Sequence, residues 1–316
     1  MEIIHGIDRL PTDTRLCATV GVFDGLHRGH VTVLDVLTGV ARRLSATATV
    51  VTFDPHPQAV VSGHAPDLIM DPAERLERLE AAGVGITVVQ QFDEAFRRTS
   101  AHDFLVRLGA GRNLKCLVMT SESAFGRDRA GTLRVMTEMS QQDGWEVVEA
   151  PRLELKGAPV SSSRIRGLIE AGRFAEAATL LGHPYAIAGD VVHGDARGRE
   201  LGFPTANLAF GDPVSLPADG IYAARATWGG ESTLSPTDGA DAVVSLGTQP
   251  TFGGRVRLFE VHLLDRHVDV YGQRMRVELV RRIRGQKRYT SVDSLVAQMG
   301  RDVERARDML ASVPQP

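Results

Sequence analysis

Short apolar runs alternate with amphipathic stretches along the first part of the chain, up to about residue 183. The runs lie at 16–22, 46–53, 86–89, 114–119 and 145–149. Their length is typical of buried strands, whereas apolar residues at helical spacing between them predict helices. This alternation predicts a parallel sheet covered by helices, in which ligands bind beyond the carboxyl ends of the strands.

The pattern changes near residue 184. Alternating segments separated by glycine and proline turns follow at 186–192, 221–228, 242–246, 258–264 and 275–279. They predict a small antiparallel barrel or sandwich, with the polar stretch 229–241 as a hairpin loop. The chain then ends in an amphipathic helix, 292 to about 311. We therefore expect two domains, residues 1–184 and 185–316.

Composition narrows the functional classes. The length of 316 residues fits two domains, and a formal net charge of -3 gives no general case for nucleic acid or anionic membranes. No signal peptide and no membrane-spanning stretch is predicted. Cys17 and Cys116, both in apolar runs, provide no disulfide framework and no zinc spacing. We expect a cytoplasmic protein with small-molecule partners, no nucleic acid and no membrane; the sequence leaves homo-oligomer formation open.

The most informative segment is Gly21-Val-Phe-Asp-Gly-Leu-His-Arg-Gly-His30, which lies between the first strand and the amphipathic stretch 31–44. His27 and His30 fall on one face at the start of a helix, where free N–H groups and the dipole favour phosphate. The three glycines let the backbone approach a ligand closely. A glycine-rich turn with two surface histidines is the alternative. The segment predicts a nucleotide-phosphate site without a P-loop lysine.

Two other segments of this part carry weaker signals. Thr52-Phe-Asp-Pro-His-Pro57 follows the second strand, and its prolines hold the backbone at His56 extended. Val160-Ser-Ser-Ser-Arg-Ile-Arg166 opens a helix, where hydroxyls and first-turn N–H groups beside arginines make an anion site. Taken alone, the first is a rigid turn and the second an ordinary helix cap.

The second part contains a strong motif, Gly198-Arg-Glu-Leu-Gly-Phe-Pro-Thr-Ala-Asn207. Thr205 and Asn207 offer hard oxygen ligands, which suit a magnesium ion shared with nucleotide phosphates. Glu260 lies on one face of the alternating segment 259–265, and a carboxylate there is either paired, functional or simply exposed. The basic run 281–288 is predicted to be a solvated face or loop.

Together these motifs resemble the bacterial bifunctional riboflavin kinase/FMN adenylyltransferase (FAD synthetase) family. Gly21–His30 is similar to the phosphate-binding signature of the HxGH nucleotidyltransferases, and Gly198–Asn207 is similar to that of riboflavin kinases. The segments His193–Gly198, Gly247–Phe252 and Asp269–Gly272 complete the resemblance. It implies an α/β Rossmann-like nucleotidyltransferase domain, followed by a small antiparallel β-barrel kinase domain with a C-terminal helix. The implied reactions are phosphorylation of riboflavin by ATP and adenylylation of FMN to FAD with release of pyrophosphate.

The resemblance also implies functional residues for each domain. In the adenylyltransferase domain, with His27 and His30 catalytic, ATP would be bound by Gly21, Phe23, Asp24, His27, His30, Ser162, Ser163 and Arg166. The flavin would contact Phe53, Pro55, His56, Pro57 and Phe125. In the kinase domain, ATP would be bound by Gly198, Gly202, Pro204, Thr205 and Asn207, with Mg²⁺ on Thr205 and Asn207. Glu260 would be the general base and a flavin contact, and Arg284 a second flavin contact.

One segment departs from the family. The usual Gly-x-Asp/Asn-Phe-x-Phe-Gly is here Thr120-Ser-Glu-Ser-Ala-Phe-Gly126, which keeps the last Phe-Gly and an acidic acceptor one methylene longer. The alternative hypothesis is therefore an active riboflavin kinase with an inactive or substrate-altered nucleotidyltransferase domain. A flavin-binding protein without turnover is a further alternative, against which the presence of Thr205, Asn207 and Glu260 argues.

Overall fold

The computed structural model describes residues 1–194, 198, 201–251, 254–266 and 268–313. They form two compact units: Met1–Pro66 with Arg75–Ser161, and Asp67–Glu74 with Ser162–Pro316. Residues 162–184 thus group with the second unit, whereas the sequence predicts a boundary after residue 184. Because compactness alone does not define an independently folding domain, the predicted boundary stays a prediction.

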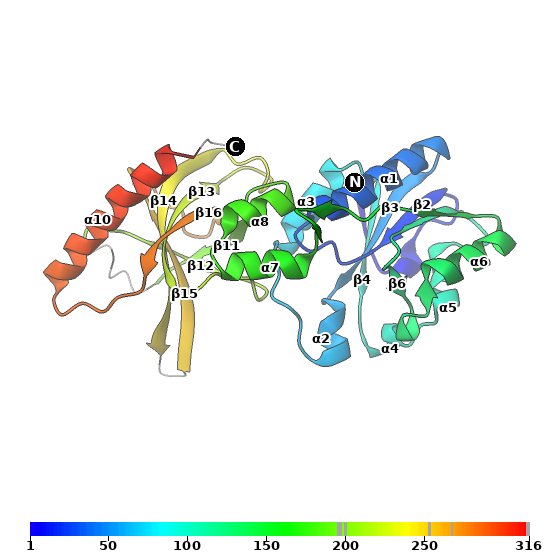
Figure 1. Ribbon diagram of the computed structural model, residues 1–316, viewed down its shortest axis with the longest axis horizontal. Helices are drawn as coiled ribbons and strands as arrows, with labels where there is room; N and C mark the ends of the chain where they lie inside the picture. Colours follow the sequence, from blue (N-terminus) through cyan, green and yellow to red (C-terminus); the bar gives the residue numbers. More distant parts are fainter. Residues whose placement is uncertain (195–197, 199–200, 252–253, 267, 314–316) are drawn as a thin grey trace. The chain divides into compact units, whose positions relative to one another are not determined.

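A six-stranded parallel sheet forms the centre of the first unit (Figure 1). Its order is β1-β4-β3-β2-β5-β8, and its strands are β1 (Glu2–His5), β2 (Leu16–Val20), β3 (Thr47–Asp54), β4 (Ile86–Gln91), β5 (Leu114–Met119) and β8 (Glu146–Glu149). The five predicted strands are confirmed. The edge strand β1 was not predicted, because only Ile4 among its residues is buried and no apolar pattern marks it.

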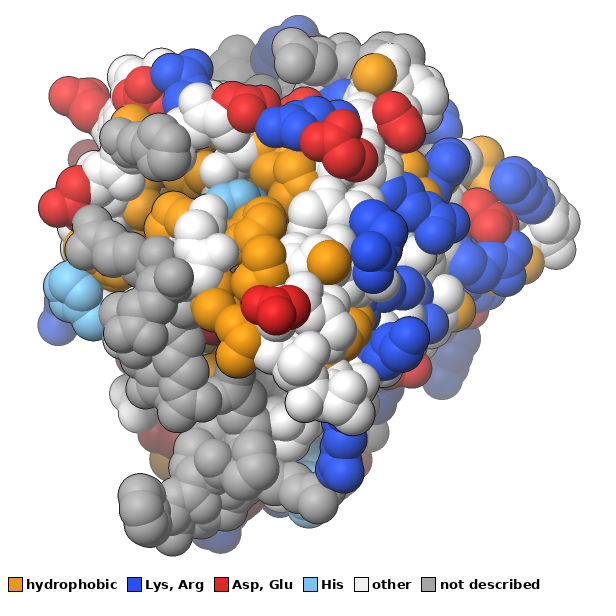
Figure 2. Space-filling view, turned by 90° about the vertical axis from the view of Figure 1, so that its left-hand side faces the viewer, with side chains coloured by type: hydrophobic (Ala, Val, Ile, Leu, Met, Phe, Trp, Pro, Cys, Tyr) orange, Lys and Arg blue, Asp and Glu red, His pale blue; other side chains and the backbone are white. Residues whose placement is uncertain are grey.

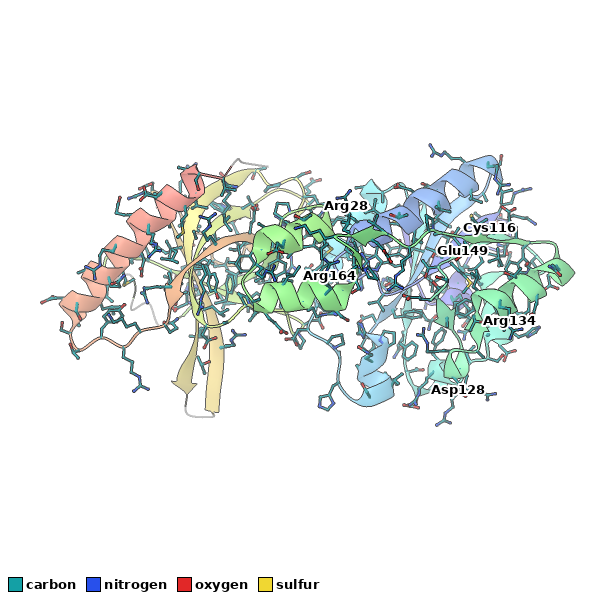
Figure 3. The ribbon with its side chains drawn as sticks, viewed as in Figure 1. Arg28, Cys116, Asp128, Arg134, Glu149 and Arg164 are labelled. Carbon is teal, nitrogen blue, oxygen red and sulfur yellow. The ribbon has the colours of Figure 1, made fainter. Side chains whose placement is uncertain are left out.

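Helices and short hairpins connect these strands. They are α1 (Arg28–Arg43), α2 (Pro57–Ser62), α4 (Glu94–Arg97), α5 (Ala101–Leu108) and α6 (Leu133–Asp143), with single turns η1 (Ile7–Arg9) and η2 (Arg127–Arg129) and strand pairs β6 (Ala124–Phe125) with β7 (Gly131–Thr132) and β9 (Glu154–Leu155) with β10 (Ala158–Pro159). Helix α1 contacts β2, β3 and β5 and buries Val33, Leu34, Leu37 and Ala41. Figure 3 labels Arg28 at the first position of α1 and Cys116 in β5.

Local sequence explains where several helices begin. The Asp71 carboxylate accepts a hydrogen bond from the backbone N–H of Ala73 at 2.9 Å, and Pro72 begins α3 (Pro72–Ala81). The Ser100 hydroxyl accepts from the N–H of Asp103 at 3.0 Å and starts α5. The Ser291 hydroxyl starts α10 (Val292–Ala311), the predicted C-terminal helix, in the same way. None of the helices among the described residues is long and apolar enough to cross a membrane.

A closed antiparallel barrel forms the second unit and confirms the predicted architecture (Figure 1). Its order is β11-β12-β15-β14-β13-β16, and its strands are β11 (Ala186–Val192), β12 (Ala206–Ala209), β13 (Gly220–Trp228), β14 (Asp238–Thr251), β15 (Gly254–Leu263) and β16 (Arg274–Gly285). The short strand β12 was not predicted as a separate element. Helices α7 (Ser162–Glu170) and α8 (Phe174–Leu181) precede the barrel.

Two predicted boundaries in the barrel were wrong. The hairpin loop predicted at 229–241 is shorter, because β14 already begins at Asp238, which pairs with Trp228. The side chains of Arg281, Arg282, Lys287 and Arg288 in the basic run 281–288 are exposed as predicted. The strand predicted at 275–279 is longer, because β16 runs from Arg274 to Gly285 and includes the first half of that run. In that half Ile283 is buried and packs with Val303 and Ala306 of α10. One buried side chain among arginines is too weak a pattern to indicate a strand.

Candidate active sites

Three predicted motifs of the first unit lie at one edge of its sheet. Strands β3, β2 and β5 are neighbours and run parallel, so their carboxyl ends meet at the same edge. The segments that follow them are Pro55–Pro57, Gly21–His30 and Thr120–Gly126. The strand order reverses between β2 and β5, which is the position at which open α/β sheets bind ligands. The arrangement therefore brings three of the predicted segments to one edge of the sheet, whereas their binding of ATP and flavin stays a prediction.

Hydrogen bonds fix the turn after β2. The carbonyl of Val22 accepts hydrogen bonds from Thr52 Oγ1 and from Arg75 Nη1, both at 3.1 Å. Gly25 has φ of 78°, the left-handed conformation that glycine favours. A Cβ on Gly21 would come 3.1 Å from the Phe23 ring, and one on Gly29 would come 3.2 Å from the His27 ring. These two glycines therefore make room for side chains of the turn itself.

The two histidines form a stacked pair at the start of α1. Their ring centroids are 3.7 Å apart with an interplanar angle of 10°. His27 is the N-cap, and its Nδ1 accepts a hydrogen bond from the backbone N–H of His30 at 3.2 Å, so Nε2 carries the proton of the neutral ring. The Nδ1 atom of His30 is buried without a partner among the described residues. This free nitrogen and the helix N-terminus suit a ligand.

Burial keeps both imidazoles neutral in the free protein. It lowers the pKa of His27 from 6.5 to about 4, against a smaller opposing effect of a backbone hydrogen bond. Burial, with a smaller contribution from the neighbouring His27, lowers the pKa of His30 well below 6.5. Neutral rings can donate a hydrogen bond from one nitrogen and accept at the other, which suits positioning of phosphate oxygens.

His27 should make stability pH-dependent in a defined window. The unfolded chain takes up the proton near pH 6.5 and the folded chain only near pH 4, so stability is fully present above 6.5 and falls as the pH drops toward 4. The pKa difference corresponds to a loss of roughly 3 kcal/mol. Urea midpoints between pH 7 and 4 should therefore fall more steeply for the natural protein than for His27→Gln, which cannot titrate. Equal slopes for the two proteins would contradict this prediction.

The predicted flavin contacts Phe53 and Phe125 belong to one aromatic cluster. Phe53 packs on Phe92 and Phe96 at centroid distances of 5.5 and 6.1 Å. Phe104 contacts Phe96 on one side and Phe125 on the other, at 6.1 and 4.9 Å. Phe53 is only 9% exposed, so much of its ring is already used in the core. Of the remaining candidates, His56 caps α2 by accepting from the N–H of Gln58 at 3.2 Å, and Pro57 begins that helix.

The segment Thr120–Gly126, which departs from the family pattern, forms a turn that is stabilised by hydrogen bonds between Thr120 and Ser123. Ser123 Oγ accepts from the backbone N–H of Thr120 at 3.0 Å and lies 2.9 Å from the Thr120 hydroxyl. The Glu122 carboxylate forms an ion pair with Arg152. Gly126 at its end is required, because a Cβ there would come 2.6 Å from the backbone nitrogen of Ala101. The altered residues thus form an ordered turn at the carboxyl edge of the sheet.

The predicted Ser162, Ser163 and Arg166 belong to the second unit. Both serines lie in the first turn of α7, as predicted. Arg166 Nε donates to the carbonyl of Asp67 at 2.7 Å. The structure brings His27 and His30 together, whereas the grouping of these three residues with the histidines stays a prediction.

The barrel places Asn207, Glu260 and Ser245 in one row. Asn207 of β12 pairs with Glu260 of β15, which pairs with Ser245 of β14. Their neighbours Ala206, Phe259 and Leu246 are buried, so the row lies on the outer face of the barrel. Pairing of adjacent strands thus brings the proposed base beside a proposed magnesium ligand, although the two are far apart in sequence.

A pocket of about 420 Å³ opens beside Glu260. Its walls are formed by Asp219, Ser245, Gly247, Thr248, Glu260, Gln286, Lys287 and Arg288. In the space-filling view that faces this unit, Lys and Arg side chains gather over one part of the surface and apolar side chains over another (Figure 2). The pocket combines two carboxylates with two cations, which is a suitable lining for a phosphorylated ligand.

The backbone at Gly194 and Gly198 packs tightly on the two side chains that are predicted to bind magnesium, Asn207 and Thr205. A Cβ on Gly194 would come 2.1 Å from Asn207 Nδ2, and one on Gly198 would come 3.3 Å from Thr205 Oγ1. A ring nitrogen of His262 lies 2.8 Å from the carbonyl of Pro204 and holds the start of β12. Gly202 has φ of 82° and makes the turn before Pro204. The motif residues Asp195, Arg197, Arg199, Glu200 and Phe252 lie outside the described residues.

Asp219 is a pocket residue that the sequence did not indicate. Burial alone would raise the pKa of its carboxyl, but hydrogen bonds and charge from Arg257, with a further hydrogen bond from Thr248, bring the pKa below its usual value. Arg257 Nε donates to the carboxylate at 2.8 Å and Thr248 Oγ1 at 3.1 Å. Asp219 precedes β13 by one residue, and no local pattern reports which distant arginine it meets.

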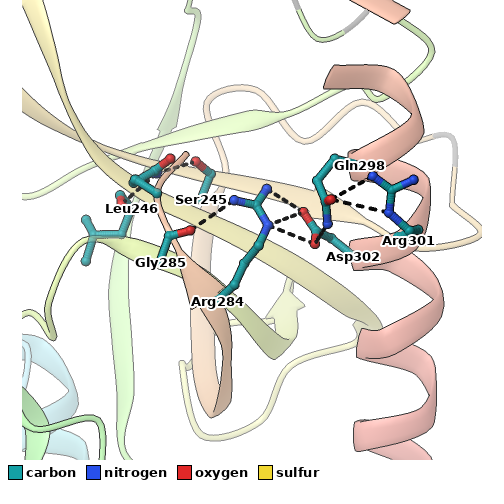
Figure 4. Close-up of polar contacts among 8 residues, drawn as sticks. Ser245, Leu246, Arg284, Gly285, Gln298, Arg301 and Asp302 are labelled. Atoms are coloured by element: carbon teal, nitrogen blue, oxygen red, sulfur yellow. Dashed lines mark hydrogen bonds and ion pairs between the residues drawn. The ribbon is translucent and has the colours of Figure 1, made fainter. Parts of the chain in front are cut away.

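Arg284 forms an ion pair with Asp302. Its Nε and Nη2 donate to both oxygens of Asp302 of α10 at 2.6–3.0 Å, and Gln298 Nε2 donates to the same carboxylate at 2.9 Å (Figure 4). The hydrogen bond and charge of Asp302 raise the pKa of Arg284 above its usual value, against burial. The guanidinium is therefore fixed by α10, and its predicted contact with flavin stays a prediction.

Comparison with known proteins gives the same assignment for both parts of the chain. A family model described as FAD synthetase matches residues 10–164, and one described as riboflavin kinase matches residues 181–310. The bifunctional riboflavin kinase/FMN adenylyltransferase of Escherichia coli K12 is 34% identical over 98% of this chain and 97% of its own length. That of Bacillus subtilis is 32% identical over 91% and 90%.

A solved structure is similar over almost the whole chain. It is described as a macrolide-efflux protein from Streptococcus pneumoniae, with a TM-score of 0.84 and 33% identity over 97% of this chain and 99% of its own. Its description names another activity than those of the curated relatives. Both family models and the curated relatives agree with each other and with the motifs.

Proposed function

The chain belongs to the bifunctional riboflavin kinase/FMN adenylyltransferase family, and we propose that its barrel converts riboflavin to FMN and its nucleotidyltransferase domain converts FMN to FAD. The observation that carries the proposal is the match of both family models in one chain, with relatives that span nearly its full length. Because the curated relatives are bifunctional, they support two activities over a kinase with an inactive first domain.

In the kinase reaction, Glu260 is the proposed general base. Its carboxylate accepts the proton of the ribityl hydroxyl while that oxygen bonds to the γ-phosphorus of ATP. The bond from the γ-phosphorus to the bridging oxygen breaks, and ADP leaves with the electron pair. The pocket beside Glu260 provides room for the acceptor, and the Gly198–Asn207 motif is the proposed nucleotide-binding element.

The donor set of this motif fits Mg²⁺. Thr205 and Asn207 offer neutral oxygens, and backbone at Gly194 and Gly198 packs so closely on their side chains that a Cβ could not be added at Gly194 without displacing Asn207. We propose that these two residues hold the ion together with nucleotide phosphates. The ion would neutralise phosphate charge. Asn207 pairs with Glu260 on the neighbouring strand, so the ion would lie next to the proposed base.

In the adenylyltransferase reaction, the phosphate oxygen of FMN bonds to the α-phosphorus of ATP and pyrophosphate leaves. The proposed role of His27 and His30 is to donate hydrogen bonds to the triphosphate as charge builds on it. Ser162, Ser163 and Arg166 are proposed as further phosphate ligands, with Phe53, Pro55, His56, Pro57 and Phe125 on the flavin side. Their support is the resemblance, together with the grouping of Gly21–His30 and Pro55–Pro57 at one sheet edge.

We also propose that the protein works in the reducing cytoplasm. Both cysteines are free and buried in adjacent strands, where no disulfide contributes to the fold. Such a state is typical of proteins from reducing compartments.

A time course with riboflavin, ATP and Mg²⁺ tests the two activities. We expect FMN to appear first on the chromatogram and FAD to follow, since the second reaction consumes the product of the first. FMN without FAD would support the kinase assignment alone and would indicate that the Thr120–Gly126 segment has abolished the adenylyltransferase activity. Absence of both products would contradict the assignment of this substrate.

A further inference from the structure

Two cations face the Glu260 pocket from one short segment. Lys287 and Arg288 follow β16 and line the pocket together with Glu260. Within the part of the chain that the structure describes, neither has a carboxylate partner in hydrogen-bond or ion-pair distance. Asp219, the other carboxylate of the lining, is already paired with Arg257. Both cations are therefore available to a ligand.

Phosphate transfer at this pocket needs such cations. A triphosphate brings several negative charges next to the Glu260 carboxylate, and catalysis of phosphoryl transfer depends on positioned positive groups. An exposed, flexible lysine or arginine contributes little to binding of the phosphates unless its backbone is fixed, because ordering the side chain and its backbone costs conformational entropy.

The residue that fixes this backbone is Gln286. Its Nε2 donates to the carbonyl of Leu246 at 3.0 Å and lies 3.4 Å from Ser245 Oγ. Ser245 is the cross-strand neighbour of Glu260, so the amide is anchored to the strand next to the proposed base. Figure 4 shows Ser245 and Leu246 beside Gly285, at the end of β16.

Gly247, which has no side chain, allows the Gln286 amide to approach β14 closely. A Cβ on Gly247 would come 2.7 Å from Gln286 Nε2, too near for both to keep their positions. The backbone of Gly247 is not in the left-handed region, so alanine is compatible with its conformation. The clash falls on the far end of a flexible side chain, which can move away. Gly247→Ala should therefore displace the amide without disturbing the barrel.

We propose that Gln286 is a positioning residue of the kinase reaction: its amide latches the Lys287–Arg288 segment to β14, so that both cations bind the phosphates of the nucleotide across from Glu260. The inference rests on the proposed function of the Glu260 pocket. Arg284, held by Asp302, fixes the segment on one side, and Gln286 fixes it at the pocket. Neither the family resemblance nor the sequence pattern assigns a role to Gln286.

The test compares Gln286→Leu, Gly247→Ala and the double variant in the full chain. Each single variant should lower kcat/KM of the kinase for ATP about tenfold, the size expected for a lost hydrogen bond with its ordering effect, and the double variant should lower it little further. Adenylyltransferase activity, measured with FMN supplied, should stay unchanged and serves as the internal control of folding.

A second comparison separates positioning from general structure. In the Lys287→Ala/Arg288→Ala background, Gln286→Leu should have no further effect, because the residues through which it acts are gone. The dependence of KM for ATP on ionic strength should also weaken in Gln286→Leu, since its cations no longer face the phosphates. An effect of Gln286→Leu that persists in the alanine background overturns the proposal, as does kinase activity of Gln286→Leu at the natural level.

Failure of the latch and failure of the proposed site can be told apart. If Glu260→Gln is inactive and Gln286→Leu is fully active, only the latch is wrong. If Glu260→Gln keeps its kinase activity, the assignment of the pocket is wrong. Should Gln286→Leu lose both activities through misfolding, Gly247→Ala decides, because it moves the same amide and leaves Gln286 in place.

Discussion

Replacement of Glu260 by glutamine should nearly abolish FMN formation. A general base contributes typically 10²–10⁴-fold to rate, and glutamine keeps the size of the side chain while losing the ability to accept the hydroxyl proton. We expect kcat of the kinase to fall by about that factor. FAD formation from added FMN should continue, because the proposed adenylyltransferase residues His27 and His30 belong to the other unit.

The measurement is initial-rate kinetics of FMN formation, with riboflavin binding followed by flavin fluorescence. The expected pattern is a large loss of kcat with nearly unchanged riboflavin affinity. Glu304→Gln is the matched control, since it makes the same substitution at an exposed carboxylate of α10 outside the pocket lining. A Glu260→Gln rate near that of Glu304→Gln would show that another group takes the proton.

Elements that bury an apolar face were predictable from sequence. The central strands β2, β3 and β5 are buried along almost their whole length, and apolar runs marked them correctly. Helix α10 was predicted close to its observed bounds, because a regular apolar stripe identifies it. The edge strand β1 and the end of β16 were missed, since each buries too few side chains to leave a pattern.

The functional sites were predictable only where the motif is local. His27 and His30 could be grouped from sequence because three residues separate them on one helix. The row of Asn207, Glu260 and Ser245 depends on the register of three strands, and the bond from Gln286 to Leu246 joins residues 40 positions apart. Spacing in the sequence does not report such contacts, so Asp219 and Gln286 emerge only from the structure.

Replacement of His30 by alanine should strongly reduce FAD formation. Removal of one positioned donor to a developing charge typically costs 10²–10³ in kcat, and the His30 ring is held for this role by its stack on His27 and its contact with Phe23. We expect a loss of that size in the conversion of FMN to FAD, with the kinase rate unchanged. Gln at this position can donate a hydrogen bond from a similar distance as Nε2 and should restore part of the rate.

The measurement compares the natural protein, His30→Ala and His30→Gln at saturating FMN and ATP. Pyrophosphate release measures the adenylyltransferase directly, and FMN formation on the same samples shows whether the chain is folded. Because the pKa of His30 lies well below 6.5, its imidazole is neutral between pH 8 and pH 6.5. Titration of His30 should therefore cause no change in the rate of the natural enzyme over this range. A rate that follows protonation of His30 within this range, or a His30→Ala enzyme at the natural rate, would exclude the neutral-donor role. A low rate in His30→Ala together with a partly restored rate in His30→Gln would identify the hydrogen bond itself as the catalytic contribution.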